Sequence, residues 1–219
     1  MEQVVRYIEE SFAALPFEYV AFYAPTFTLN RAWTTRLCEE LVERGARYPW
    51  KCATTVHHLD EELVALMGRS GCVRISVGVE TLAESGHAAL PRLKRKGEDA
   101  VEALAAWCER AGIELNCFVI VGLPGTTVAD AEAAIARVRS VGGRVRPTMY
   151  SPHEQLHPDI PLDALSLHNR QILPDGAFPE PAERQRAYDI VFGHEQRPTR
   201  VGEQMGERQA AAPAGSPRS

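Results

Sequence analysis

The sequence has no apolar run long enough to cross a membrane, and it does not open like a secretion signal. A membrane-spanning helix needs about 20 consecutive apolar residues, and no run in this 219-residue chain approaches that length. The first segment, MEQVVRYIEESFAAL, is amphipathic and acidic, whereas a signal peptide starts with basic residues and continues with an apolar stretch. We therefore expect a cytoplasmic protein with no membrane partner.

An excess of positive charge is also missing. The chain has 24 Lys and Arg residues against 29 Asp and Glu residues, which gives a net charge of −5. A nucleic-acid-binding protein usually presents a basic surface, so we expect no nucleic-acid partner. The hydrophobic fraction of 45% is that of an ordinary globular protein, and the length is enough for one sizeable core.

None of the five cysteines forms a CxxC or CxxxC pair. They are Cys38, Cys52, Cys72, Cys108 and Cys117. Their odd number and wide spacing argue against a disulfide framework and provide no local zinc or iron-sulfur motif. We expect most of these thiols to be buried and inert. A Walker loop, a GxGxxG motif and a Ser-His-Asp order are absent as well.

What the sequence does have is a regular alternation of helix and strand signals. Predicted helices cover residues 4–15, 31–43, 60–68, 97–111 and 128–141, and predicted strands cover residues 17–23, 50–55, 72–79, 113–121 and 144–150. Asn30 and Asp60 are the expected N-caps of the second and third helices. Repeated βα units imply parallel strands with right-handed crossovers. The predicted fold class is therefore α/β, either a partial barrel or an open sheet.

The stretch CFVIVGLPGTT, from Cys117 to Thr127, joins one predicted strand to the following helix. Its apolar part suits a strand that is buried on both faces. The glycines at 122 and 125 allow a sharp turn, and Pro124 fixes φ between them. A helix that starts at such a turn presents free backbone N–H groups to a ligand beside the strand end. The alternative is an ordinary βα turn without a ligand.

Ligands of α/β sheets and barrels bind at the carboxyl ends of the strands. The candidate residues there are Ala24, Pro25, Thr26, Thr55, His57, His58, Gly78, Glu80, Gly122 to Thr126, Tyr150 and His153. The carboxylate of Glu80 could accept hydrogen bonds from ribose hydroxyls or an amine, or could serve as an N-cap or ion-pair partner. In an extended chain His57 and His58 point in opposite directions, so they would not hold one metal together. The basic run from Arg92 to Lys96 is a solvated loop or, alternatively, a ligand contact.

Four segments follow one another in a distinctive order: FYAPTF, WKCATT, LDEELVALMGRSGCVRISVGVE and AGIELNCFVIVGLPGTT. In this order they resemble the core of the radical S-adenosylmethionine (SAM) superfamily, in the branch whose strands end in GxE and GLPG-T. The resemblance covers residues 4–150, and PTMYSPHEQL continues it. It implies a partial (βα)6 barrel that lacks its first strand.

The resemblance also implies two cofactors, SAM and a 4Fe-4S cluster. In the family, the cysteines of a CxxxCxxC loop hold the cluster, and reductive cleavage of SAM yields a deoxyadenosyl radical that abstracts hydrogen from a substrate. By resemblance, Glu80 lies near the ribose or the methionine moiety. The residues expected at the adenine are Phe118, Ile120, Gly122, Leu123, Pro124 and Gly125, and those expected at the amino group of SAM are Ala24, Pro25 and Thr26.

The sequence departs from the family pattern at two places. It begins at the helix that follows the CxxxCxxC loop, so the first strand and the cluster cysteines are missing, and Ala24 stands where the branch usually has an acidic residue. No metal ligand is predicted, and the catalytic residues and the substrate, a small molecule or a peptide, stay undefined.

These departures leave three interpretations. The first is a truncated enzyme, inactive alone, that needs a missing N-terminal segment or a partner chain. The second is a degenerate, non-catalytic paralogue or a subunit of a split enzyme that acts as a binding protein. The third is an unrelated βα-barrel enzyme that uses Glu80 and His57 as acid and base.

The expected organisation is a partial barrel core at 1–150, a partly helical extension at 151–201 and a disordered tail at 202–219. Short helices are predicted near 162–173 and 182–192. Without a first strand, the apolar strand at 17–23 would leave an unpaired sheet edge. We therefore expect obligate association or aggregation of the free chain.

Overall fold

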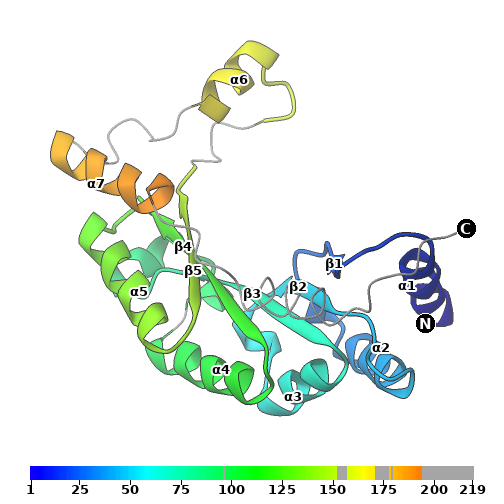
Figure 1. Ribbon diagram of the computed structural model, residues 1–219. Coiled ribbons are helices and arrows are strands. Elements are labelled where there is room, and N and C mark those ends of the chain that lie inside the picture. Colours follow the sequence, from blue (N-terminus) through cyan, green and yellow to red (C-terminus); the bar gives the residue numbers. More distant parts are fainter. Residues whose placement is uncertain (96, 152–156, 171–177, 179, 194–219) are drawn as a thin grey trace, which may run out of the picture.

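The structure is a computed structural model that describes residues 1–95, 97–151, 157–170, 178 and 180–193 (Figure 1). In chain order its helices and strands are α1 (Glu2–Ala14), β1 (Val20–Phe22), α2 (Arg31–Glu43), β2 (Trp50–Thr54), α3 (Glu61–Arg69), β3 (Cys72–Glu80), α4 (Glu98–Arg110), β4 (Glu114–Val121), α5 (Val128–Ser140), β5 (Arg144–Met149), α6 (Leu162–Arg170) and α7 (Pro181–Phe192). The predicted alternation is therefore confirmed.

The five strands form one parallel sheet in the order β1-β2-β3-β4-β5. The sheet is curved, and α2 to α5 follow one another along its convex face (Figure 1). This arrangement confirms the predicted α/β class and matches a partial TIM-like barrel of the radical SAM type. The carboxyl ends of all five strands lie at one edge, where such folds place their ligands.

Side chains of the central strands alternate between the helical layer and the concave face. On β3, Ile75, Val77 and Val79 are at most 1% exposed and belong to the core under the helices. Full burial of an aliphatic side chain contributes about 1.5–3 kcal/mol, so this layer supplies most of the stability. The predicted burial on both faces is wrong for the apolar run that starts at Cys117, because Phe118 and Ile120 on the concave face are only partly buried, although Asn116 on the same face is buried.

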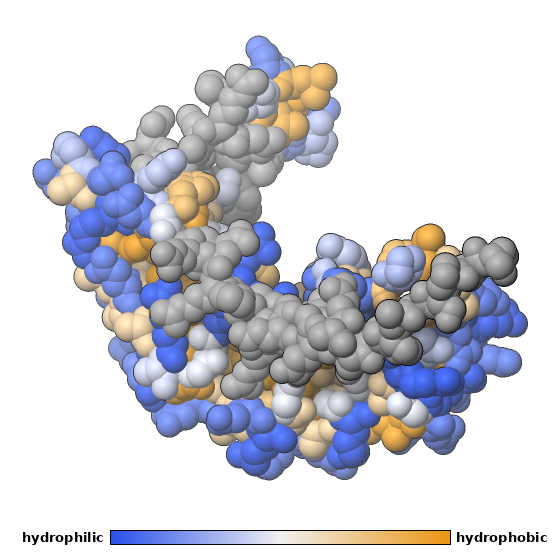
Figure 2. Space-filling view, viewed as in Figure 1, coloured by the Kyte–Doolittle hydropathy of each residue, from blue (hydrophilic) through white to orange (hydrophobic). Residues whose placement is uncertain are grey.

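The two predicted N-caps are confirmed, and one of them also joins two helices. The Asn30 side chain accepts a hydrogen bond from the Trp33 N–H at 3.0 Å, and Asp60 accepts one from the Leu63 N–H at 2.9 Å. The Asp60 carboxylate also accepts two hydrogen bonds from Arg31, at 2.6 and 3.2 Å. These Arg31 hydrogen bonds lower the pKa of Asp60. The outer surface of the helical layer is mostly hydrophilic (Figure 2).

Strand β1 is shorter than the predicted strand at 17–23. It starts at Val20, opposite Trp50, and it ends where the Ala24 N–H turns back to the Phe22 carbonyl at 3.1 Å. The predicted edge position is confirmed within the described chain, since β2 is the one strand that pairs with β1 there. The flanking aromatics are open to solvent, with Phe17 49% exposed and Tyr23 98% exposed.

The C-terminal extension has two described helices. The predicted helix near 162–173 is observed as α6, although residues 171–173 lie outside the described chain, and α6 stands apart from the sheet (Figure 1). Helix α7 packs through Ala187 and Val191 against Val121, Val128 and Phe178. The predicted tail at 202–219 lies outside the described residues, and the domain boundaries at 150 and 201 stay predictions. No helix in the described ranges is long and apolar enough to span a bilayer.

Because the edge of β1 is exposed, we predict that the chain associates with itself. Two charged substitutions beside this edge should reduce the association. Replacing Phe17 and Tyr23 by Lys places charge on an unpaired sheet edge, which opposes edge-to-edge pairing. We expect light scattering to show associated species for the native chain and a larger monomer fraction for the double variant. Leu162→Lys, at an 83% exposed position on α6, should leave association unchanged. A monodisperse native monomer would contradict the prediction.

Candidate functional site

A cavity of about 410 Å³ lies at the carboxyl ends of the strands. Its volume falls in the usual range of about 300–1,000 Å³ for small-molecule sites. Strands β2 to β5 and the loops after β1, β2 and β3 supply its walls. The described lining residues are Pro25, Thr26, Ala53, Thr54, Thr55, Ser76, Gly78, Glu80, Leu93, Lys94, Phe118, Ile120 and Thr148. Hydroxyl groups, one carboxylate and one ammonium therefore face an otherwise apolar space.

Glu80 ends β3 in an unusual backbone conformation. Its φ is 61°, in the left-handed region that costs a residue with a side chain about 1–2 kcal/mol. The register between β3 and β4 shifts between Gly78 and Glu80, which marks a local bulge. Backbone strain of this kind is common at binding and catalytic sites. Here the strain turns a carboxylate, on a residue only 8% exposed, into the cavity.

Gly78 provides the space into which the Glu80 side chain folds. A Cβ on Gly78 would stand 2.3 Å from Glu80 Oε1, closer than such atoms can approach. The GxE pattern thus has a local reason, because any side chain at position 78 would displace the carboxylate.

The Glu80 carboxylate has a cationic partner. Lys94 Nζ donates to Glu80 Oε1 at 3.0 Å, and the Lys94 side chain is 48% exposed. Lys94 belongs to the short 3-10 turn η4 (Arg92–Lys94). A half-exposed ion pair of this kind contributes at most about 1 kcal/mol, so a ligand could exchange it for its own polar groups. Of the cations in the basic run, Lys94 is therefore the one placed to contact a ligand. Arg95 donates to the Leu90 carbonyl at 3.2 Å, and Lys96 lies outside the described residues.

The structure brings together some of the predicted site residues and separates others. The cavity lining includes Pro25, Thr26, Glu80, Phe118 and Ile120, and Ala24 lines an adjoining cavity. Gly122, Leu123, Pro124 and Gly125 are not among the described residues that line either one.

The glycines of the GLPG turn lie in close contact with neighbouring residues. Gly125 has φ 86°, and a Cβ there would stand 2.5 Å from the Ser85 carbonyl oxygen. Gly122 has φ 83°, and a Cβ added there would stand 3.2 Å from the Phe178 ring. The start of α5 carries a capping box, in which Thr127 and Asp130 each accept a hydrogen bond from the backbone N–H of the other. Two of the N–H groups expected to face a ligand are thus already bonded.

The condition under which His57 and His58 would point in opposite directions, an extended chain, is not met. Both lie in a 3-10 turn, η2 (Val56–His58), rather than in extended chain, and their ring centroids are 4.2 Å apart. Neither lines the strand-end cavity, whereas Thr55 does. The Tyr150 N–H bonds to the Val121 carbonyl at 2.8 Å, and His153 lies outside the described residues.

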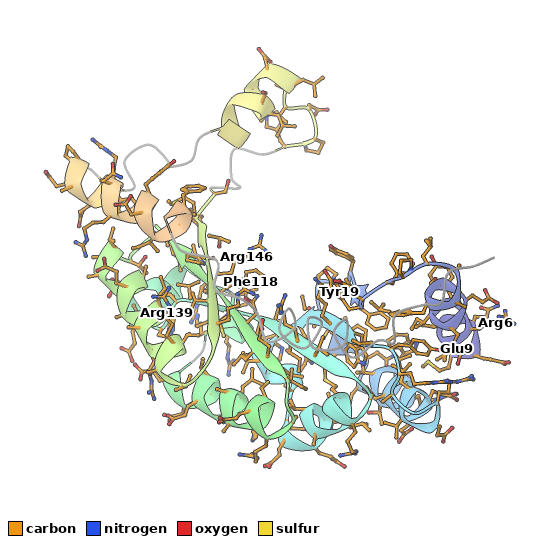
Figure 3. All side chains as sticks on the ribbon, viewed as in Figure 1. Arg6, Glu9, Tyr19, Phe118, Arg139 and Arg146 are labelled. Carbon is orange, nitrogen blue, oxygen red and sulfur yellow. The ribbon has the colours of Figure 1, made fainter. Side chains whose placement is uncertain are left out.

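A second cavity, of about 760 Å³, continues along the concave face toward the amino ends of the strands. The two cavities share Pro25, Ala53, Ser76 and Phe118. Figure 3 places Phe118 and Arg146 together beside β4 and β5, with Tyr19 across the sheet near β1.

Sequence reasoning missed Ala53, Thr54, Ser76 and Thr148 in the strand-end lining. Ser76 could have been found from the alternation on β3, where it shares a face with Gly78 and lies two residues before it. Leu93 also lines the cavity, and it belongs to the basic run from Arg92 to Lys96.

The cysteines do not form a metal centre. All five are free, buried and spread over the core, and the described residues contain no group of three His, Cys, Asp or Glu side chains that could hold a metal ion. Burial raises the pKa of Cys38 to about 11 and the pKa values of Cys108 and Cys117 to about 12. Iron is bound by thiolates, so these protonated thiols do not fit a 4Fe-4S cluster.

The sequence matches the Radical SAM superfamily over residues 1–138. This match covers more than half of the chain, so the chain belongs to the radical SAM superfamily. The interpretation as an unrelated βα-barrel enzyme is therefore wrong. Curated proteins yield no match.

Solved structures with the same fold support this assignment. The chain is similar to the radical SAM methyltransferase TsrM from Kitasatospora setae, solved with cobalamin and a 4Fe-4S cluster, at 19% identity and a TM-score of 0.57, over 64% of this chain and 27% of that one. It is also similar to coproporphyrinogen III oxidase from Escherichia coli, a radical SAM enzyme, at 18% identity and a TM-score of 0.55, over 77% of this chain and 37% of that one.

These similarities, at under 25% identity, show the fold. The chain spans about a quarter to somewhat over a third of the two structures. A further structure of TsrM contains its tryptophan substrate and the SAM analogue aza-SAM. SAM and a 4Fe-4S cluster are thus the cofactors that the family resemblance supports.

Replacing Gly78 by Ala should move the Glu80 carboxylate out of the cavity while the fold is kept. The clashing atom is the far end of a flexible side chain, so we expect a loss of stability of about 1 kcal/mol or less. A crystal structure of the variant should show the Lys94 contact broken. Gly97→Ala, where a Cβ meets nothing within 4 Å, is the matched control. An unmoved Glu80 would contradict the prediction.

The buried thiols predict that this chain alone assembles no cluster. After anaerobic incubation with iron and sulfide, we expect no stoichiometric bound iron and no iron-sulfur absorbance. Iodoacetamide should label the native protein slowly and the urea-unfolded protein quickly, because labelling requires an accessible thiolate. A stoichiometric 4Fe-4S cluster on the isolated chain would overturn this prediction.

Proposed function

We propose that this chain forms the SAM-binding wall of a radical SAM enzyme, with the strand-end cavity as the SAM site. The observation that carries the proposal is the strained Glu80, which holds a buried carboxylate in that cavity opposite Lys94. Such an arrangement suits a ligand that carries hydroxyl, ammonium and carboxylate groups.

The lining matches the parts of SAM. Glu80 would accept hydrogen bonds from the ribose hydroxyls or the α-amino group, and Lys94 would attract the α-carboxylate. Phe118 and Ile120 offer an aromatic and an aliphatic surface for the adenine. The hydroxyls of Thr55 and Thr148 can satisfy further polar atoms of the ligand.

The roles of these residues are to bind, orient and partly desolvate SAM. When SAM is bound beside a reduced cluster, the family chemistry supplies a deoxyadenosyl radical for hydrogen abstraction. The residues described here do not fit the cluster, so no electron-transfer step is assigned to them. We propose that cluster ligands come from a segment outside this sequence or from a partner chain, and that the unpaired edge of β1 is where such a segment adds to the sheet.

A second candidate function is a non-catalytic binding subunit. Ala24 cannot accept a hydrogen bond through its side chain from the amino group of SAM, and it lines the adjoining cavity rather than the strand-end one. A degenerate paralogue would still bind SAM or a related nucleoside. The two functions differ when a partner that supplies cluster cysteines is added. The complex would then cleave SAM if this chain is part of an active enzyme, and it would not cleave SAM if this chain is a non-catalytic binding subunit.

The SAM site can be tested on the isolated chain by equilibrium dialysis, which needs no cluster. We expect saturable SAM binding that Glu80→Gln weakens by about tenfold or more, since a hydrogen bond to a charged group contributes about 1.5–3 kcal/mol. Adenosine should compete, because it occupies the Phe118 side of the cavity.

Glu84→Gln is the matched control. Glu84 is exposed, lies four residues after Glu80 and is not among the described residues of the cavity lining. Its substitution should leave SAM affinity unchanged. Equal affinities of the native chain and Glu80→Gln, or no binding by the native chain, would refute the proposal.

A further inference from the structure

The larger cavity has a charge imbalance that the composition of the chain does not predict. Of the described residues that line it, four are cationic and none is acidic: Lys51, Arg74, Arg144 and Arg146. The whole chain carries a net charge of −5. These cations come from three strands, β2, β3 and β5, and all face the same concave surface.

One acidic residue beside this cavity, Glu114, neutralises only part of the charge. Its Oε1 receives a hydrogen bond from Arg74 Nε at 2.6 Å and lies 3.7 Å from Arg144 Nη1. The Glu114 side chain is only 9% exposed, so its charge is needed to offset Arg74 within the sheet. Arg144, 33% exposed and at the longer distance, keeps donor capacity toward the cavity.

Lys51 and Arg146 have aromatic neighbours and no carboxylate within ion-pair distance among the described residues. Lys51 Nζ lies 4.1 Å from the centre of the Tyr19 ring, and Arg146 Cζ lies 6.0 Å from the centre of the Phe118 ring. An aromatic face orients a cation without neutralising it. Both positive charges therefore remain available to a ligand.

The geometry of β5 concentrates two of the cations. Arg144 and Arg146 are two residues apart on one strand, so they share a face, with Cα atoms about 6.6 Å apart at a rise of about 3.3 Å per residue. Asn116 stands opposite Arg144, and Phe118 stands opposite Arg146. Two guanidinium forks, an amide and an aromatic ring thus line one wall, while Lys51 faces them from β2.

We infer that this cavity binds an organic anion, a carboxylate or a phosphate ester with an apolar or aromatic portion. Arg146 and Arg144 hold the anionic group, and Phe118 and Ala53 contact the apolar portion. Guanidinium groups pair with both carboxylates and phosphates through paired N–H donors. Anion binding here does not depend on SAM, whereas its interpretation as the substrate site rests on the proposed function.

The two cavities adjoin each other, and this supports the interpretation of the anion cavity as a substrate site. An anion held beside Arg146 would place its apolar part along Phe118, toward the SAM cavity that shares this residue. The substrate class would then be an anionic small molecule that is anchored at the amino half of the sheet and presented to the strand ends.

The test uses the isolated chain without SAM and three matched probes: benzoate, phenyl phosphate and benzyl alcohol. Ligand-observed NMR titration should show saturable binding of at least one anion and at least tenfold weaker binding of the neutral alcohol. A preference between benzoate and phenyl phosphate identifies the anionic group. Anion binding should weaken as ionic strength rises, because salt screens the charges.

Variants of the exposed Arg146 locate the site. Arg146→Gln should weaken anion binding by about tenfold, and Arg146→Lys should weaken it less, because Lys keeps the charge and loses the fork. Arg139→Gln is the matched control, since Arg139 lies on α5 and lines a separate groove (Figure 3). Equal binding of benzyl alcohol, no effect of Arg146→Gln, or an equal loss with Arg139→Gln would each overturn the inference. Equilibrium dialysis of SAM with the same variants shows separately whether the SAM site binds its ligand, so failure of the anion site can be told apart from failure of the SAM site.

Discussion

The constraint on which this structure depends is that all its crossover helices pack on the same face of a parallel sheet. Consecutive strands lie side by side in chain order, and crossovers of one hand then place α2 to α5 together on the convex face (Figure 1). That face receives nearly all of the aliphatic core. The concave face has no helix from α2 to α5 over it, so its strands carry Arg74, Asn116 and Arg146 where a two-sided sheet would carry Val or Ile.

Much of this fold could be predicted from the sequence, because its signals are local. Side-chain alternation, caps such as Asn30, and glycines after helices depend on neighbours a few residues apart. The predictions failed where a distant partner decides the outcome. The length of β1 depends on where β2 begins, and the contact of Lys94 with Glu80 joins residues 14 apart through a loop without periodicity. The left-handed backbone of Glu80 follows from a shift in pairing with β4 that no single strand reveals.

The described residues offer a cavity suited to an organic cofactor and no site for iron. The strand ends keep a polar, strained, partly enclosed cavity suited to a nucleoside with a charged tail. The thiols are placed for packing: Cys108 and Cys117 lie in the hydrophobic core, and burial raises their pKa values to about 12. A buried, protonated thiol behaves as a small apolar side chain. The family match covers residues 1–138, which include most of the lining of the cavity proposed for SAM, whereas the described residues contain no group that could hold iron.

Phe118 belongs to the walls of both cavities, so the two compartments cannot change independently. A smaller residue at this position would enlarge the strand-end cavity and the cationic cavity together. If both proposed ligands bind, sequence drift at this position is limited by two ligands rather than one. Adaptation of this scaffold to a new anionic compound would proceed more freely at Asn116, which lines the cationic cavity and is not among the described residues of the strand-end lining, than at the ring that the two ligands would share.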